Sequence, residues 1–235
     1  MATTGHTVKA FDQDLDELRA TIAEMGGLAE EAIREAMRAL VQRDSEGALR
    51  VVEADRRIDA LETELERAAV QLIALRAPMA DDLREVIAAL KIASVVERIG
   101  DYAKNIAKRV QVIGEAPVIE PLSLLPEMAR IAGEMVHSVL DAFAARDAEK
   151  ALAVCERDRA VDDFYNSIFR TLLTFMMENP HNITPATHLL FVAKNLERIG
   201  DHATNAAEMV YFAATGLHVA DRPRGAATET VGSDG

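Results

Sequence analysis

Two carboxylates and an amide recur at four-residue spacing in a phrase that this chain contains twice. The first copy, ERIGDYAKN, runs from Glu97 to Asn105, and the second, ERIGDHATN, runs from Glu197 to Asn205. Seven of the nine positions are identical, and the copies lie 100 residues apart. Carboxylate and amide oxygens are ligands for hard cations, so the repeated spacing raises the possibility of a metal site.

Helical geometry would place each set of oxygens on one stripe. Residues four apart in an α-helix differ by only ~40° around the axis, so Glu97, Asp101 and Asn105 would align. The second copy aligns Glu197 and Asp201 in the same way. On both helices the apolar residues recur nearly opposite, which predicts acids that face outward. These apolar residues are Ile92, Val96, Ile99, Ala103, Ile106 and Val110 in the first copy, and Val192, Leu196, Ile199, Ala203, Ala206 and Val210 in the second.

A second pair of acids precedes each copy of the phrase. EADRRIDALE (53–62) resembles ERDRAVDDFY (156–165), and both contain two Asp residues four positions apart. We expect these acids to lie off the apolar stripe of Ala54, Ile58, Leu61 and Leu65. In antiparallel neighbouring helices, each pair would then share one outer surface with the acids of the repeated phrase. The two predicted sets of metal ligands are Asp55, Asp59, Glu97 and Asp101, and Asp158, Asp162, Glu197 and Asp201.

Carboxylates gathered in this way repel one another unless a cation neutralises them. Oxygen-only ligands suit hard divalent ions and carboxylate-bridged iron, and the pattern does not distinguish Fe, Mn, Mg or Zn. The Glu-x-x-His pairs of inward-facing di-iron bundles are absent from the chain, which weakens an oxidase interpretation. An alternative is that the acids are solvated and pair with nearby arginines. The arginines in question are Arg56, Arg98, Arg157 and Arg198.

The remaining chemistry-bearing residues form no recognisable catalytic pattern. No phosphate-binding glycine loop, nucleophile elbow or Ser/His/Asp order is present in the sequence, so we assign no catalytic residue and no organic cofactor. His202 has Tyr102 as its counterpart, so the repeat does not retain it. Five histidines lack any paired ligand spacing: His137, His181, His188, His202 and His218.

Composition and periodicity predict an all-α protein. The 235 residues are 49% hydrophobic and 4% aromatic, with few glycines and prolines. Such a composition favours helix, because its dominant side chains lose little freedom there. An apolar residue at every third or fourth position predicts the first helix. That stripe consists of Leu15, Leu18, Ile22, Met25, Ala29, Ile33, Ala36 and Leu40.

Local signals divide the rest of the chain into five more helices. Asp44 or Ser45 would cap the second, which we expect to end near Arg76 before the third begins at Asp81 or Asp82. The third would end near Gly114, ahead of a connection with three prolines. The last three would span 126–145, 147–179 and 184–216, the last with Thr184 as its N-cap and Pro185 in first position.

The repeat indicates internal duplication, and therefore two tandem three-helix bundles. We place the first bundle at residues 8–116 and the second at 119–218. Residues 219–235, and the first several residues of the chain, carry no apolar period, so we expect them to be disordered.

Charge and cysteine content narrow the function class. The net charge of −13 disfavours a nucleic-acid partner and suits cations or basic surfaces of other proteins. A single cysteine, Cys155, permits no disulfide within one chain and fits the cytoplasm. The opening residues lack a signal-peptide pattern, and the longest apolar run contains Lys91, so we expect no direct membrane insertion.

Two long segments closely resemble the PhoU family of phosphate-signalling regulators. They are RAPMADDLREVIAALKIASVVERIGDYAKNIAKR and LLTFMMENPHNITPATHLLFVAKNLERIGDHATNAAEMVYFAATG, and the resemblance extends over about residues 10–218. It implies two tandem three-helix bundles without enzymatic activity. It also implies metal clusters on the outer surface, held by four Glu/Asp-x-x-x-Asp motifs that match the eight acids above, with Asn105 and Asn205 as weaker candidates. Ala206 departs from the family pattern by being smaller than its usual apolar residue.

The resemblance further implies a role in phosphate homeostasis. Such proteins link the ATPase subunit of the phosphate ABC transporter to a membrane sensor histidine kinase, and they repress phosphate-starvation genes (the Pho regulon) when phosphate is plentiful. A homodimer is expected as well, because Met25 and Met37 suggest more apolar area than one bundle needs. Two alternatives stay open, a carboxylate-bridged metalloenzyme and a purely structural helical scaffold.

Overall fold

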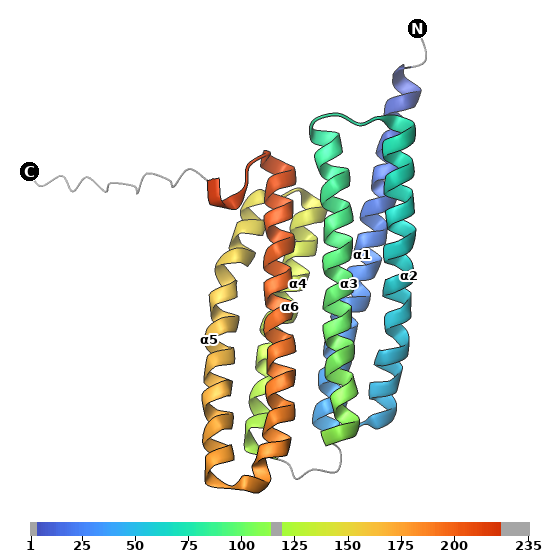
Figure 1. Ribbon diagram of the computed structural model, residues 1–235. Helices are drawn as coiled ribbons and strands as arrows, with labels where there is room; N and C mark the ends of the chain where they lie inside the picture. The colour runs from blue at the N-terminus through green and yellow to red at the C-terminus, as the bar shows by residue number, and fades with distance from the viewer. Residues whose placement is uncertain (1–3, 114–118, 222–235) are drawn as a thin grey trace, which may run out of the picture.

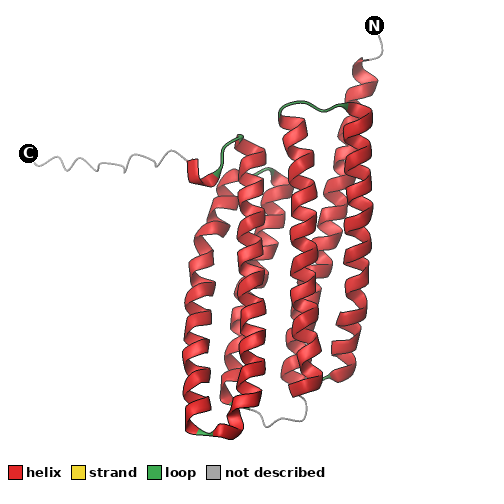
Figure 2. Cartoon of the chain, viewed as in Figure 1, coloured by secondary structure: helices red, strands yellow, loops and turns green. Residues whose placement is uncertain are grey.

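The computed structural model describes residues 4–113 and 119–221 of the chain. Within these ranges the protein forms six long α-helices, short 3-10 helices and no strand (Figure 2). The α-helices are α1 (Thr4–Gln42), α2 (Ser45–Arg76), α3 (Asp81–Ile113), α4 (Leu125–Ala145), α5 (Ala148–Glu178) and α6 (Ile183–Thr215). The 3-10 helices are η1 (Glu120–Leu124), η2 (Pro180–Asn182) and η3 (Val219–Asp221). The predicted all-α architecture of two three-helix bundles is confirmed.

Equivalent caps begin the middle helix of each half. The side chain of Asp44 accepts a hydrogen bond from the backbone N–H of Gly47 at 2.8 Å, and Asp147 accepts one from Lys150 at 2.9 Å. Each carboxylate satisfies a backbone donor that the first helical turn leaves unpaired. The capping role predicted for Asp44 is therefore confirmed.

The start of α6 differs from the prediction. The helix begins at Ile183, and its N-cap residue is Asn182, which makes no side-chain capping hydrogen bond. Thr184 therefore lies inside the first turn and is not the cap. Pro185 is the third residue of the helix and not the first as predicted, and it is tolerated there because the N–H that proline lacks would have no intrahelical partner.

The ends of the chain also differ from expectation where they are described. Helix α1 already begins at Thr4, within the segment that we expected to be disordered. Residues Val219–Asp221 form the 3-10 helix η3 at the start of the expected disordered tail. The rest of that tail, residues 222–235, lies outside the described residues, as do Gly114 and the four residues after it.

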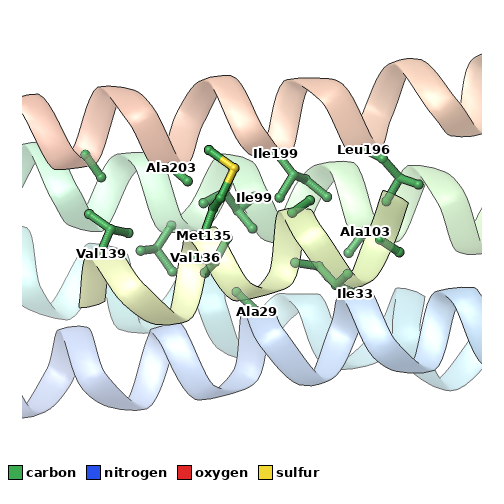
Figure 3. Packing of buried hydrophobic residues seen from close by; sticks show 14 of the residues in the cluster. Ala29, Ile33, Ile99, Ala103, Met135, Val136, Val139, Leu196, Ile199 and Ala203 are labelled. Carbon is green, nitrogen blue, oxygen red and sulfur yellow. The ribbon is translucent and has the colours of Figure 1, made fainter. Parts of the chain in front are cut away.

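The two bundles lie side by side and share one continuous core. In Figure 1, α3 and α6 lie in front with α1 and α4 behind them, while α2 and α5 form the two flanks. Figure 3 shows side chains from α1, α3, α4 and α6 meeting in this core, among them Ile33, Ile99, Val136 and Ile199. The apolar stripes predicted for α1, α3 and α6 are all buried, so those core assignments are confirmed.

Burial of two methionines changes the argument for a dimer. Met25 is fully buried in the predicted core stripe of α1, and Met37, which lines a pocket with Pro126 and Ala129 of α4, is 5% exposed. The apolar area on which we based the expectation of a dimer is therefore used within one chain. The dimer itself stays a prediction.

A buried carboxylate on α3 connects the two halves of the protein through ion pairs. Glu85 on α3 is 6% exposed and accepts hydrogen bonds from the Nε atoms of Arg19 at 2.9 Å and Arg146 at 3.1 Å. Arg19 belongs to α1 of the first half, whereas Arg146 follows α4 of the second. Removing either guanidinium would leave Glu85 with fewer partners, so the arrangement ties α1 and α3 of the first half to the end of α4 in the second.

Candidate metal-binding clusters

The first cluster forms where α2 packs against α3, and it is more enclosed than predicted. Asp55 is only 4% exposed, whereas Ala54 lies on the exposed face of α2. The predicted placement of Asp55 off the buried stripe was therefore wrong, because the stripe runs through position 55 and not position 54. One residue changes the direction of a helical side chain by ~100°. Asp59 is exposed as predicted.

The glycine of the repeated phrase explains how the helices approach at this point. A Cβ atom on Gly100 would lie 2.8 Å from Ile58 Cδ1 and 3.3 Å from Asp55 Oδ1. In the other half, a Cβ atom on Gly200 would lie 3.2 Å from Val161 Cγ1. The absence of a side chain at both glycines lets α2 and α5 come close to α3 and α6, and so it brings the acids together.

A lysine that we did not consider lies within the first cluster. The Lys104 ammonium forms ion pairs with Asp55 Oδ2 and with Asp101 Oδ1, and so it bridges α2 and α3. Burial disfavours the charge of Lys104, but its hydrogen bonds to the two carboxylates outweigh this and raise its pKa. The spacing of Lys104 three residues after Asp101 was a usable signal, because residues three apart are neighbours on a helix.

The carboxyl groups of this cluster are close enough to affect one another's ionisation. Burial, followed by the charges of Asp101, Glu62 and Asp59, raises the pKa of Glu97 to about 7. Burial also raises the pKa of Asp55, and the charges of Asp59 and Asp101 add to the effect against the opposing influence of Lys104. The four predicted acids of the first half therefore do come together, with Glu62 as a further acid nearby.

The second cluster forms in the same way between α5 and α6. Burial raises the pKa of Asp158, and the charges of Asp162 and Glu197 raise it further. Burial and the charges of Glu197, Asp158 and Asp162 raise the pKa of Asp201. The four predicted acids of the second half are therefore also mutual neighbours, although Asp162 and Asp201 are more exposed than the buried Asp55.

The second cluster has its lysine at a different position. Lys194 Nζ lies 2.5 Å from Glu197 Oε1 and 5.3 Å from the ring centroid of Tyr165. Thr204 occupies the position equivalent to Lys104, and its hydroxyl makes no hydrogen bond of normal geometry within the described residues but lies close enough to Asp158 to lower the pKa of that carboxyl. The position equivalent to Lys194 is Ser94. Each half thus supplies one ammonium group. Lys104 follows the repeated acids along α3, whereas Lys194 precedes them along α6.

The arginines named in the alternative interpretation form no ion pair with these acids in the described residues, although the charge of Arg98 partly offsets the raised pKa of Glu97. Arg157 pairs with Glu134 Oε2 at 2.7 Å instead of with an acid of the cluster. Within the described ranges, Arg56, Arg98 and Arg198 form no ion pair. Asn105 and Asn205, the weaker candidates, are partly buried and exposed respectively. The neutralising groups are lysines, and they leave most of the carboxylates unpaired.

The donor set fits a hard cation in both halves. All the predicted ligands offer oxygen, and Asp55 Oδ1 is buried without a hydrogen-bond partner. As placed, however, no three Asp, Glu, His or Cys side chains within the described part of the chain converge closely enough to hold one ion. In the first cluster, the Lys104 ammonium lies between two of the carboxylates that a cation would need.

The helices described here do not span a membrane. None of them combines the length and the apolar character that a membrane-spanning helix requires.

Comparison with known proteins relates both halves of the chain to one family. A family model described as the PhoU domain matches residues 22–110 and again residues 125–210. The phosphate-specific transport system accessory protein PhoU homolog of Zymomonas mobilis is 58% identical over 221 residues, which cover 94% of this chain and 93% of the relative. The homolog of the same name from Caulobacter vibrioides is 48% identical over 226 residues, which cover 94% and 97%.

Solved structures have the same fold. The crystal structure of PhoU from Pseudomonas aeruginosa matches with a TM-score of 0.85 at 36% identity, covering 88% of this chain and all of that chain. The phosphate transport system regulatory protein PhoU from Streptococcus pneumoniae matches with a TM-score of 0.82 at 29% identity, covering 89% and 99%.

Proposed function

The chain belongs to the PhoU family, and from that membership we propose that it is a negative regulator of phosphate uptake and of the phosphate-starvation response. The observation that carries the proposal is the match along both halves to relatives named as accessory or regulatory proteins of phosphate transport. Those names describe regulators and not enzymes, which supports a role without catalysis.

Regulation would operate through protein contacts. We propose that the chain acts in the cytoplasm as an adaptor between the ATPase subunit of the phosphate ABC transporter and a sensor histidine kinase. A helical surface without a membrane-spanning element among its described helices suits such a role. The proposed homodimer rests on the family resemblance, since the methionines that first suggested it are buried.

Gene deletion tests the regulatory role. A strain that lacks the protein should express a phosphate-starvation reporter at high phosphate, and the intact chain should restore repression. Co-purification of the tagged protein with transporter and kinase subunits tests the adaptor role. Repression that survives the deletion would contradict the regulatory proposal.

The acid clusters support a second part of the proposal, namely that the protein binds hard metal ions. Burial and mutual repulsion make the ionised carboxylates unfavourable in the metal-free protein, and a bound cation would neutralise them. The residues that would hold it are Asp158, Asp162, Glu197 and Asp201 between α5 and α6, and their counterparts Asp55, Asp59, Glu97 and Asp101 between α2 and α3. Because each set draws on two helices, binding would also strengthen their contact.

Substitution of one acid in each cluster tests this part separately. Asp101→Ala and Asp201→Ala together should lower the metal content after loading with manganese or iron, as measured by elemental analysis. The fold should persist, since the altered side chains are at least partly exposed. Glu64→Ala with Glu66→Ala is a matched control, because these acids lie on an exposed face of α2. Equal metal content in all three proteins would exclude the clusters as the binding site.

A further inference from the structure

The arginines of the two repeated phrases, Arg98 and Arg198, belong to α3 and α6, which pack against each other along their length at the front of Figure 1. Arg98 and Arg198 are exposed. Between them, Tyr102 Oη and His202 Nε2 are 3.1 Å apart, and the two rings stack with centroids 5.3 Å apart.

Aromatic rings hold two guanidinium groups on this seam. Arg198 Cζ lies 5.7 Å from the Tyr102 ring centroid, and Arg109 Cζ lies 4.6 Å from that of Phe191. A guanidinium that stacks on a ring keeps its N–H groups available at the edge, where they can donate to a carboxylate. Stacking also limits the freedom that these side chains would lose on binding.

Ten other described arginines form ion pairs with acids, whereas the three arginines of this seam do not, and Arg98 interacts with the neighbouring Glu97 only through its charge. Within residues 4–113 and 119–221, Arg98, Arg109 and Arg198 form no ion pair. Ten other arginines do pair with acids: Arg19, Arg34, Arg38, Arg50, Arg57, Arg76, Arg84, Arg130, Arg146 and Arg157. In a chain of net charge −13, three unpaired cations on one seam form a locally basic surface.

The spacing of the cations indicates the shape of the ligand. Positions 98, 102 and 109 recur at four and seven residues and so share one face of α3, and positions 191, 198 and 202 do the same on α6. Arg98 and Arg109 are eleven positions apart, which corresponds to ~16 Å along the helix. One small oxyanion cannot reach both ends of such a row, whereas a polypeptide with several carboxylates can.

We propose that the α3–α6 seam, defined by Arg98, Tyr102, Arg109, Phe191, Arg198 and His202, is a docking surface for an acidic segment of a partner protein. The arginines would donate to its carboxylates, and Phe191, which is 47% exposed, would contact an apolar side chain between them. Nucleic acid fits less well, because its continuous phosphate charge would also meet the acid clusters on both sides of the seam. The inference requires neither metal binding nor the proposed regulatory role.

A direct binding experiment tests the surface with the full chain. The probe is a short fluorescein-labelled peptide rich in Glu and Leu, followed by fluorescence anisotropy at low and moderate salt. Arg98→Gln, Arg109→Gln and Arg198→Gln combined should weaken binding about tenfold or more. The matched control combines Arg56→Gln, Arg67→Gln and Arg170→Gln, which removes the same charge from exposed positions on α2 and α5.

Two further variants separate the contributions. Replacing the three seam arginines by lysine keeps the charge but removes the planar donor fork, so binding should weaken less than with glutamine. Phe191→Ala should weaken binding while leaving its salt dependence unchanged, because it removes no charge.

The outcomes discriminate between the possible ligands. Loss of binding in the seam variant with unchanged binding in the control supports the proposal. No binding by the parent protein, or equal losses in the seam and control variants, overturns it. Complete displacement of the peptide by millimolar inorganic phosphate would also overturn it, because it would indicate a site for a small oxyanion.

Discussion

The two carboxylate clusters contain the same acids in the same order, yet their surroundings differ. In the first, Asp55 is buried and the Lys104 ammonium lies between Asp55 and Asp101. In the second, Thr204 replaces that lysine, and Lys194 approaches Glu197 from the other end of the stripe. Lys194 is also more exposed, at 41% of its side chain against 20% for Lys104.

This difference shows that a repeated ligand motif does not guarantee two equal sites. A tethered ammonium competes with a metal ion for the same oxygens, and it is most effective where burial limits solvent screening. We therefore expect the second cluster to bind metal more tightly than the first. The four predictions below test this inequality, and the largest expected effect comes first.

Exchange of the residue at position 104 should have the largest effect. Lys104→Thr gives the first cluster the threonine that the second cluster has at the equivalent position, Thr204. It also removes a positive charge beside the carboxylates of the first cluster. The affinity of this cluster for Mn²⁺ should rise about tenfold to a hundredfold, since nearby charges interact by a few kcal/mol at an intermediate effective dielectric constant. Isothermal titration calorimetry would measure the change as a second tight site.

The mirror-image substitution serves as the control. Thr204→Lys should weaken binding at the second cluster by a similar factor and leave the first unchanged. If both variants bind metal like the parent, position 104 does not distinguish the clusters, and the proposed competition is wrong.

Removing one carboxylate charge should destabilise the protein more in the first cluster than in the second. Asp55→Asn deprives Lys104 of a buried partner and should lower the free energy of unfolding of the metal-free protein by about 1–3 kcal/mol. Asp158→Asn, at the more exposed equivalent position, should change it by less than about 0.5–1 kcal/mol. Denaturant unfolding in the presence of a chelator gives both values, and equal losses would contradict the difference in burial.

The pH dependence of stability should carry a contribution from the first cluster. The pKa of Glu97 is raised from 4.5 to about 7 in the folded protein. Between these values the folded state holds a proton that the unfolded chain has released, so stability falls as the pH rises from about 4.5 to about 7. Glu97→Gln should flatten this part of the profile in thermal unfolding with chelator. A profile identical to that of the parent would show that Glu97 titrates normally.

The smallest effect is expected at the lysine of the second cluster. Lys194→Ser introduces the residue found at the equivalent position in the first half. Because Lys194 is well exposed, its ion pair with Glu197 should contribute only about 0–1 kcal/mol to stability, and manganese affinity should change by no more than a few fold. A change as large as that of Lys104→Thr would show that the two lysines are equivalent after all.

Local signals predicted the elements well, because they depend on neighbours in the chain. Asp44 and Asp147 marked helix starts, and the apolar stripes of α1, α3 and α6 predicted buried faces. The repeat also predicted which acids come together. Each of these inferences needs only the geometry of a single helix and the presence of some neighbouring helix that covers its apolar face.

Features that depend on how helices meet were not predictable in the same way. The burial of Asp55 depends on the close approach of α2 at Gly100. The position of Lys104 depends on a side-chain conformation that bridges two helices. The burial of Met37, which lies off the predicted stripe, depends on α4 of the second half packing beside it. In each case the determining contact comes from another helix, and helical periodicity does not report it.

The contact between Tyr102 and His202 has a consequence for how the sequences of two joined bundles can diverge. These residues occupy equivalent positions in the two halves and touch each other where α3 crosses α6. In an assembly of two identical bundles, the residue at this crossing would have to be its own partner, so tyrosine would meet tyrosine or histidine would meet histidine. Joining both bundles in one chain removes that restriction, because each position can mutate alone. A donor and an acceptor of different chemistry can then meet at the crossing, which two identical subunits related by a twofold axis cannot achieve.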